Sequence, residues 1–269
     1  MTITLTYPEG GALVTGGTGN VGEGVVRRLA AAGVPVVFTY RGASKERAQA
    51  LQAELRDAGH AVTAQTMDMT DIASIQAVVD QVVSEHGRLH TVACGAGVPV
   101  TFNRLADFSI EEVEKFMWGD ALGYYRVFHT AIRAMRAGGG GSITTCSTMA
   151  LRRYVAFDGI SPLSKGSVEA LVRQIAKEER ENGIRSNAVG IGWVHAYTRE
   201  QFRNWIPREN PADPQTQEER TTVLLNQLIN GIDRPATPSE AGDLFAFLAS
   251  DQARYITGQT ILLDGGFTL

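Results

Sequence analysis

A glycine-rich turn near the start of the chain constrains the fold more than any other feature. The segment Gly17-Thr18-Gly19-Asn20-Val21-Gly22 has the spacing G-x-G-x-x-G and stands between an apolar run at 11–15 and a helical pattern at 23–32. This strand–turn–helix context raises the spacing above chance. Glycines let the backbone approach a pyrophosphate, which free amides and the positive end of a helix dipole attract. The turn therefore predicts a dinucleotide-binding unit, with an unliganded tight turn as the alternative.

Short apolar runs alternate with longer helical patterns along most of the chain, as is typical of βαβ units. The predicted strands are 11–15, 34–40, 61–67, 91–94, 142–146, 186–189 and 260–263. The predicted helices are 23–32, 44–58, 72–86, 110–136 and 162–182. Right-handed crossovers wind such strands into one α/β, doubly wound parallel sheet of seven strands with helices on both faces, the Rossmann fold. We expect residues 1–269 to form a single domain.

One stretch breaks this alternation. Residues 197–234 lack a strand pattern and contain Pro207, Pro211 and Pro214. A long insertion of this kind is usually functional, so we expect a substrate lid. Its apolar side chains either form a wall for the substrate or pack the lid onto the body; they are Phe202, Trp205 and Ile206.

The composition excludes several classes of protein. Hydrophobic residues at 43%, charged residues at 20% and a net charge of −4 are ordinary for a globular protein. Lysines and arginines are scattered, which argues against nucleic acid or an anionic membrane as partner. The first residues have no leader-like or membrane-spanning run, which favours a cytoplasmic protein. The five histidines have no metal-ligand spacing, and Cys94 and Cys146 lie in apolar runs as packing thiols, so we expect no metal.

The end of the second predicted strand indicates which nicotinamide dinucleotide is bound. An NAD-specific site places a carboxylate there to bind the adenosine ribose, but residues 39–45 contain none. Arg41 is available for a 2′-phosphate, with Ser44 and Lys45 beside it. NADP(H) is therefore favoured over NAD(H). The alternative is that Arg41 and Lys45 are simply solvated.

Taken in order, these segments resemble the short-chain dehydrogenase/reductase family over nearly the whole chain. The matching segments are the turn at 15–22, the Asp-Met pair at 68–69, CGAG at 94–97 where the family has Asn-Asn-Ala-Gly, SNAVGIG at 186–192, YITGQ at 255–259 and DGG at 264–266. The resemblance implies a cofactor site made of Gly16, Thr18, Gly19, Asn20, Val21, Gly22, Tyr40, Arg41, Asp68, Met69, Gly95, Ala96, Gly97, Lys165, Ile191, Gly192 and Val194.

The family's catalytic set of Ser, Tyr, Lys and Asn is only partly present. Lys165 matches the lysine, which in the family holds the nicotinamide ribose, but Ser161 stands at the tyrosine position four residues before it. The serine position is Thr148, with Ser147 beside it, and the asparagine position is Asp120. A serine hydroxyl is a much weaker acid than a tyrosine with a lowered pKa. Ser161 is either a hydroxyl donor in the site or the N-cap of a helix whose first-turn proline is Pro162.

Three functions remain open. The leading one is an NADP(H)-dependent oxidoreductase that transfers hydride to or from a small carbonyl or alcohol, with a non-standard proton donor. Tyr154 is the first candidate donor, followed by His195 and Tyr197. The second is an enoyl reductase acting on 2-enoyl or 2,4-dienoyl thioesters, because the dienoyl-CoA reductase branch also has Ser at the tyrosine position; Ala150 and Ser147 fill the nearest equivalents of that branch's own tyrosine. The third is a catalytically inactive NADP-binding sensor or partner subunit.

The resemblance also implies a homo-oligomer, either a dimer or a homotetramer. The apolar tail Phe267-Thr268-Leu269 suits burial against a neighbouring subunit. We expect a small-molecule substrate and neither nucleic acid nor membrane as partner.

Overall fold

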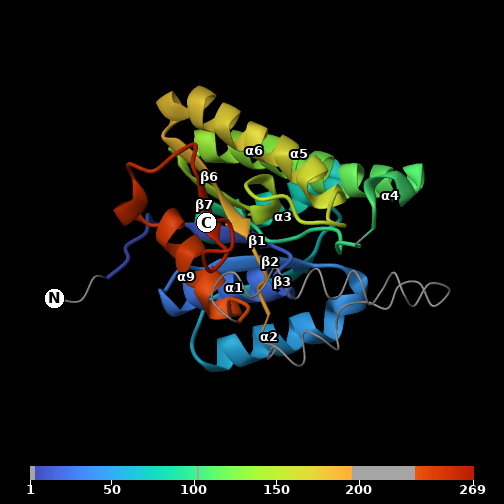
Figure 1. Cartoon of the computed structure of the whole chain (residues 1–269). Helices are drawn as coiled ribbons and strands as arrows, with labels where there is room; N and C mark the ends of the chain where they lie inside the picture. Colours follow the sequence, from blue (N-terminus) through green and yellow to red (C-terminus); the bar gives the residue numbers. More distant parts are fainter. Residues whose placement is uncertain (1–3, 102, 196–233) are drawn as a thin grey trace.

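The computed structural model describes residues 4–101, 103–195 and 234–269, which fold around one parallel sheet (Figure 1). Seven strands pair in the order β3-β2-β1-β4-β5-β6-β7. All neighbouring strands are parallel. The strands are β1 (Gly11–Thr15), β2 (Val36–Tyr40), β3 (Val62–Thr66), β4 (Leu89–Cys94), β5 (Gly141–Thr148), β6 (Ile184–Ile191) and β7 (Thr260–Leu263). The predicted doubly wound sheet of seven strands is confirmed, with bounds that differ by a few residues.

Helices cover both faces of the sheet (Figure 1). One layer contains α1 (Asn20–Ala31), α2 (Lys45–Asp57) and α9 (Pro238–Ala249), and the other contains α3 (Ile72–His86), α5 (Gly123–Ala137) and α6 (Ile160–Glu178). Each layer closes its own apolar core, one with Val25, Phe38 and Phe245 and the other with Ile75 and Phe128. Both faces are therefore buried, as the apolar strands of a parallel sheet require.

Helix α9 was absent from the helices predicted by periodicity, although its start carries a clear signal. Thr237 accepts a hydrogen bond from the Glu240 amide at 3.2 Å, and the Glu240 carboxylate accepts one from the Thr237 amide at 2.7 Å. This capping box, with Pro238 in the first turn, fixes where the helix begins. The helix packs against α1 so closely that a Cβ on Gly242 would collide with the carbonyl of Gly24.

The helix predicted over 110–136 is not uniform. It consists of α4 (Ile110–Phe116), a π-helical turn (Met117–Leu122) and α5. Such wide turns change the direction in which side chains project and are frequent at functional sites. This one buries Asp120, which is a candidate site residue. Hydrophobic spacing predicts the helix but gives no signal for the wide turn.

The strand order places a crevice between β1 and β4. Strand β1 has β2 on one side and β4 on the other, so the connections leaving these strands run in opposite directions along the sheet. Ligands of open parallel sheets bind at the carboxyl ends of the strands at such a point. Within the described residues, no helix has the length and apolar character needed to cross a membrane.

Replacing Phe245 by alanine tests the packing of α9. Phe245 is 1% exposed in the core beneath α9, whereas Phe247, two residues later, is half-buried. We expect Phe245→Ala to lower the free energy of unfolding by about 3–5 kcal/mol, because it leaves a cavity in a closed core. Urea denaturation measures the loss, with Phe247→Ala as the matched control. Equal losses in the two variants would contradict this placement of α9.

Candidate active site

The glycine turn lies flat against the end of β4. The Gly17 amide donates to the Thr39 carbonyl at 2.9 Å, and the Gly95 amide donates to the Thr15 carbonyl at 3.1 Å. Gly16 has a φ of 69°, and a Cβ there would lie 2.6 Å from Ala96 Cα. A Cβ on Gly22 would collide with the Gly16 carbonyl. Only glycine fits these two positions, and the turn is fixed at the crevice between β1 and β4.

The turn opens helix α1 without a side-chain cap. Its N-cap is Gly19, and no side chain accepts from the first-turn amides. These amides and the helix dipole are thus available to an anionic group. Asn20, predicted to bind the cofactor, points elsewhere: its Nδ2 donates to the Val194 carbonyl at 3.1 Å and lies 3.0 Å from His195 Nδ1. Burial lowers the pKa of His195.

A cavity of about 260 Å³ extends from this turn across the ends of β2, β3 and β4. Much of the predicted cofactor site lines it, namely Gly16, Thr18, Gly19, Tyr40, Arg41, Asp68, Met69, Gly95, Ala96 and Gly97. Other predicted residues are not in its lining: Asn20, Val21 and Gly22 begin α1, Lys165 is in α6, and Ile191, Gly192 and Val194 end β6 or follow it. The residues that were predicted to bind the adenosine end of the cofactor therefore lie around one cavity.

The two charged side chains in the described lining, Asp68 and Arg41, differ in their hydrogen bonding. The Asp68 carboxylate accepts from the amide and the hydroxyl of Thr70, both at 2.8 Å. These hydrogen bonds hold the pKa of Asp68 below its usual value. Arg41 is exposed, and no residue in the described ranges forms a hydrogen bond or ion pair with its side chain. The positively charged guanidinium group of Arg41 therefore lines the cavity without a hydrogen-bond or ion-pair partner among the described residues.

A buried ion pair stands beside the same cavity. Lys165 Nζ lies 2.9 Å from Asp120 Oδ2, and both side chains are almost fully buried. The Val98 amide donates to Asp120 Oδ1 at 2.9 Å, and Ser164 Oγ donates to Oδ2 at 3.4 Å. A Cβ on Gly97 would lie 3.4 Å from Asp120 Oδ1 and 3.8 Å from Lys165 Nζ. Because Gly97 lines the cavity, the pair lies directly behind this part of its wall.

Tyr124 joins this pair from the next turn of α5. Its hydroxyl lies 3.4 Å from Lys165 Nζ, and its ring centroid lies 4.5 Å from the same nitrogen. The hydroxyl donates to the Ala96 carbonyl. Burial raises the pKa of Tyr124 well above its usual value, so the phenol stays protonated. It therefore stabilises the ammonium group by a hydrogen bond and a cation–π contact rather than exchanging protons.

Ser161 is not the N-cap predicted for the helix that carries Lys165. Helix α6 begins at Ile160, and the Ser161 hydroxyl donates to Asp158 Oδ1 at 2.5 Å. The N-cap residue of α6 is Gly159, and the Ser161 amide also favours the ionised form of the Asp158 carboxyl. Phe157, with a left-handed φ of 68°, turns the chain into this arrangement. Burial raises the pKa of Asp158 to about 6, although both hydrogen bonds from Ser161 oppose the rise.

The other predicted catalytic residues form no hydrogen bond with Lys165 in the described structure. Ser147 donates to Glu169 Oε1 at 2.7 Å, where Glu169 also pairs with Arg152. Thr148 accepts from the Ala150 amide at 3.2 Å. Tyr154 is 81% exposed and has no hydrogen bond in the part of the chain that the structure describes. Tyr197 and the predicted lid, apart from Arg234, fall outside the described residues.

Sequence reasoning missed Tyr124, Asp158 and Ser164. Tyr124 follows Asp120 by four residues in one helical stretch, a spacing that brings side chains to the same face. Asp158 precedes Ser161 by three residues at a helix start, which is the spacing of a cap. Both spacings are visible in the sequence, but neither indicates that Tyr124 will contact Lys165 or that Asp158 will contact Ser161.

Comparisons with known proteins agree with this geometry. A family model described as Enoyl-(Acyl carrier protein) reductase matches residues 17–268. Oxidoreductase UcpA of Salmonella typhimurium is 32% identical over 262 residues, which are 96% of this chain and 94% of that protein. A short-chain type dehydrogenase/reductase structure from Mycobacterium ulcerans has a TM-score of 0.83 at 26% identity and covers 98% of this chain and 91% of its own. An actinorhodin polyketide ketoreductase variant solved with NADPH has a TM-score of 0.82 at 26% identity, with 97% of each chain covered.

The chain belongs to the short-chain dehydrogenase/reductase family. It is an oxidoreductase of that type.

A double-mutant cycle tests the buried ion pair. We expect Asp120→Asn and Lys165→Met each to lower the free energy of unfolding, by about 3 kcal/mol, because each leaves one buried charge unpaired. The double variant should lose clearly less than the two single losses together. Glu54→Gln, in the exposed pair with Arg27, is the control and should change stability far less. Strictly additive losses at Asp120 and Lys165 would argue against the pair.

Proposed function

We propose that this protein is an NADP(H)-dependent oxidoreductase that transfers hydride to or from a small carbonyl or alcohol. The observation that carries the proposal is one continuous site. The uncapped start of α1 and Arg41, which has no ion-pair partner among the described residues, border one cavity, and the Asp120–Lys165 pair lies behind its wall at Gly97. A related ketoreductase was solved with NADPH, which supports the same cofactor here.

The residues present fit this cofactor. The Thr18 amide and the free first-turn amides of α1 would hold the pyrophosphate, and Arg41 would hold the 2′-phosphate. Asp68 and Met69 would border the adenine. Lys165, held by Asp120 and Tyr124, would hold the nicotinamide ribose by hydrogen bonds. The bound nicotinamide supplies or accepts the hydride, and the protein's own groups must manage the accompanying proton.

We assign that proton to Asp158 acting through Ser161, which we place at the position of the family's tyrosine. The serine alone is too weak an acid, but its hydroxyl lies 2.5 Å from a carboxyl whose pKa is raised to about 6. A carboxyl with such a pKa is available in both protonation states near neutral pH. Asp158 is thus a positioning residue that keeps Ser161 supplied with a proton.

In either direction of the reaction, one proton moves between the substrate oxygen and the Asp158 carboxyl by way of the Ser161 hydroxyl. In the reducing direction the substrate oxygen takes the Ser161 hydroxyl proton, and Ser161 Oγ takes the proton of the Asp158 carboxyl. Asp158 then carries the negative charge that began on the substrate oxygen. In the oxidising direction the same carboxylate receives the alcohol proton through Ser161. Tyr154 is not needed in this scheme, in keeping with its exposed ring.

Reduction of a 2-enoyl or 2,4-dienoyl thioester is the second candidate. The buried Ser161 hydroxyl favours it, because a hydroxyl donor can stabilise an enolate oxygen without transferring a proton to it. NADPH oxidation measured with matched 2-enoyl and 3-oxo thioesters separates the two functions. Faster turnover of the 3-oxo compounds supports carbonyl reduction. Tight NADPH binding without turnover of either class would leave a cofactor-binding sensor or partner subunit.

Arg41→Gln tests the choice of cofactor. We expect this variant to bind NADPH about tenfold or more weakly, because a charge-assisted hydrogen bond to the 2′-phosphate is lost, and to bind NADH as before. Fluorescence titration of both cofactors measures the effect. Arg41→Lys is the matched control, since it keeps the charge. Unchanged preference for NADPH in Arg41→Gln would refute the role of this arginine.

Asp158→Asn tests the proton supply. We expect kcat for carbonyl reduction to fall as pH rises through about 6 in the wild type, because the Asp158 carboxyl loses its proton there, and alcohol oxidation to rise over the same range. Asparagine still accepts from Ser161 but cannot titrate. Its kcat should fall by about 10²-fold or more, and the pH dependence near 6 should disappear.

Steady-state rates between pH 5 and pH 8 measure these profiles on the best carbonyl substrate of a panel. Asp107→Asn, at an exposed carboxylate, is the control and should keep the wild-type profile. A wild-type pH dependence retained in Asp158→Asn would exclude the assignment.

A further inference from the structure

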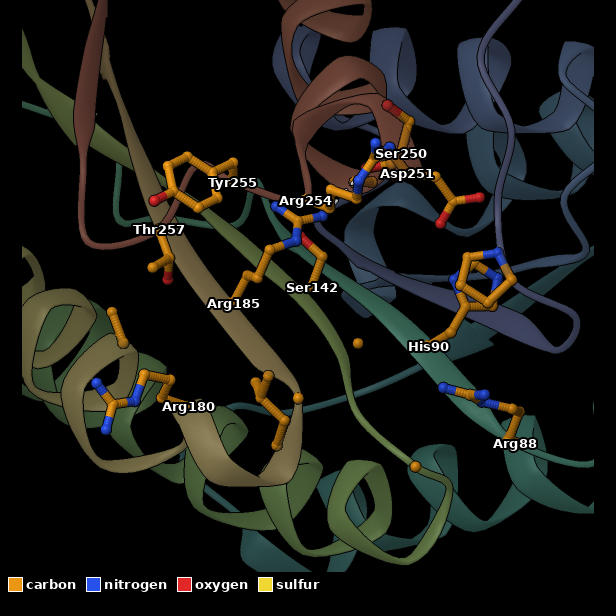
Figure 2. A pocket seen from close by; sticks show the side chains of 17 residues that line it. Arg88, His90, Ser142, Arg180, Arg185, Ser250, Asp251, Arg254, Tyr255 and Thr257 are labelled. Atoms are coloured by element: carbon orange, nitrogen blue, oxygen red, sulfur yellow. Dashed lines mark hydrogen bonds between the residues drawn. The ribbon is translucent and has the colours of Figure 1, made fainter.

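Four arginines surround a second cavity, at the opposite end of the sheet from the cofactor cavity (Figure 2). Its volume is about 590 Å³, and its walls include the starts of β5 and β6. The arginines come from four separate segments. Arg88 precedes β4, Arg180 follows α6, Arg185 lies in β6, and Arg254 follows α9. Figure 2 shows these side chains around an open centre.

The described lining holds four guanidinium groups and one carboxylate, so the positive charge of this cavity is only partly balanced. None of the four arginines has an ion-pair partner among the residues that the structure describes. Arg185 donates to the carbonyls of Ser250 and Ile256 at 3.2 and 3.3 Å, and Arg254 donates to the Asp251 carbonyl at 3.2 Å. Asp251 has the one carboxylate in the described lining, and it accepts from the Thr6 hydroxyl at 3.0 Å. Carbonyls satisfy hydrogen bonds but leave the charges uncompensated.

Three groups in the wall, Arg88, Arg185 and His90, are affected by burial or by nearby positive charge. Arg88 Nη2 donates to the Gly140 carbonyl at 2.9 Å, but Arg88 Nε is buried and has no hydrogen-bond partner within the described ranges. Burial lowers the pKa of Arg185. Burial and the charge of Arg88 together lower the pKa of His90 to about 4, against the opposing effect of Asp251. A negatively charged ligand would relieve each of these effects.

We propose that this cavity binds a small organic phosphate. Guanidinium groups match phosphate oxygens with paired hydrogen bonds, and several arginines around one cavity suit an anion with several acceptor atoms. The volume is that of a small-molecule site. The Tyr255 ring is fully exposed at the rim, and Ala176 and Ile184 supply apolar wall for the organic part of the ligand. This inference does not depend on the proposed reaction.

Calorimetric titration with inorganic phosphate and phenyl phosphate tests the proposal. The phenyl ester should bind more tightly than inorganic phosphate, and Tyr255→Ala should remove that advantage. The double variant R180Q/R254Q should bind both probes about tenfold or more weakly. Arg180 and Arg254 are exposed and hold no other side chain in the described structure, so the variant should fold normally.

Two controls locate the binding. Arg133→Gln, on the exposed side of α5, removes the same kind of charge, and Arg41→Gln alters the cofactor cavity; both should bind phenyl phosphate as the wild type does. In NMR titrations, bound phosphate should raise the pKa of His90 above about 4, which binding at the cofactor cavity would not do. No binding to the wild type, equal binding to R180Q/R254Q, or no advantage of the phenyl ester would each overturn the proposal.

Discussion

The buried ion pair between Asp120 and Lys165 is the interaction on which the site depends. Removing two charges from water costs on the order of several kcal/mol per ion, which attraction offsets only when the remaining donors and acceptors are satisfied. Here the Val98 amide and the Ser164 hydroxyl satisfy the carboxylate, and Tyr124 satisfies the ammonium group. The pair thereby joins the π-helical turn, helix α6 and the segment after β4 at one point beside the cavity. Displacing any of these elements would leave a buried charge without its partner.

The same pair explains why the proton has to come from elsewhere. Lys165 is held by Asp120 and Tyr124, and burial keeps the Tyr124 phenol protonated, so this tyrosine does not exchange protons. The carboxyl of Asp158, in contact with Ser161, titrates in a useful range because burial destabilises its charge. Two carboxylates on neighbouring elements therefore have different tasks: one fixes the cation, and the other supplies a proton. Their surroundings, rather than their chemical type, make the difference.

Short-range patterns in the sequence predicted those features that depend on neighbouring residues in the chain. The glycine turn, the strand pattern and Arg41 follow from spacing and from a missing carboxylate, and all of them reappear at one cavity. The parts that depend on tertiary packing did not follow. The π-helical turn has no signature in hydrophobic spacing, and the contact of Tyr124 with Lys165 joins residues 41 positions apart. Ser161 was expected either to cap the helix or to donate a hydroxyl in the site, and the structure places it inside the first turn of α6 with its hydroxyl donating to Asp158. Helix α9 was missed although its capping box was visible.

A crystal structure of the protein with NADP⁺ bound tests the central claim most directly, because it shows at once which groups meet the phosphates and what lies beside the nicotinamide. The account predicts the pyrophosphate at the start of α1, the 2′-phosphate against Arg41, and Lys165 at the nicotinamide ribose with Ser161 the nearest side-chain hydroxyl to the reactive carbon. A 2′-phosphate directed away from Arg41, or a nicotinamide far from the Asp120–Lys165 pair, would contradict it.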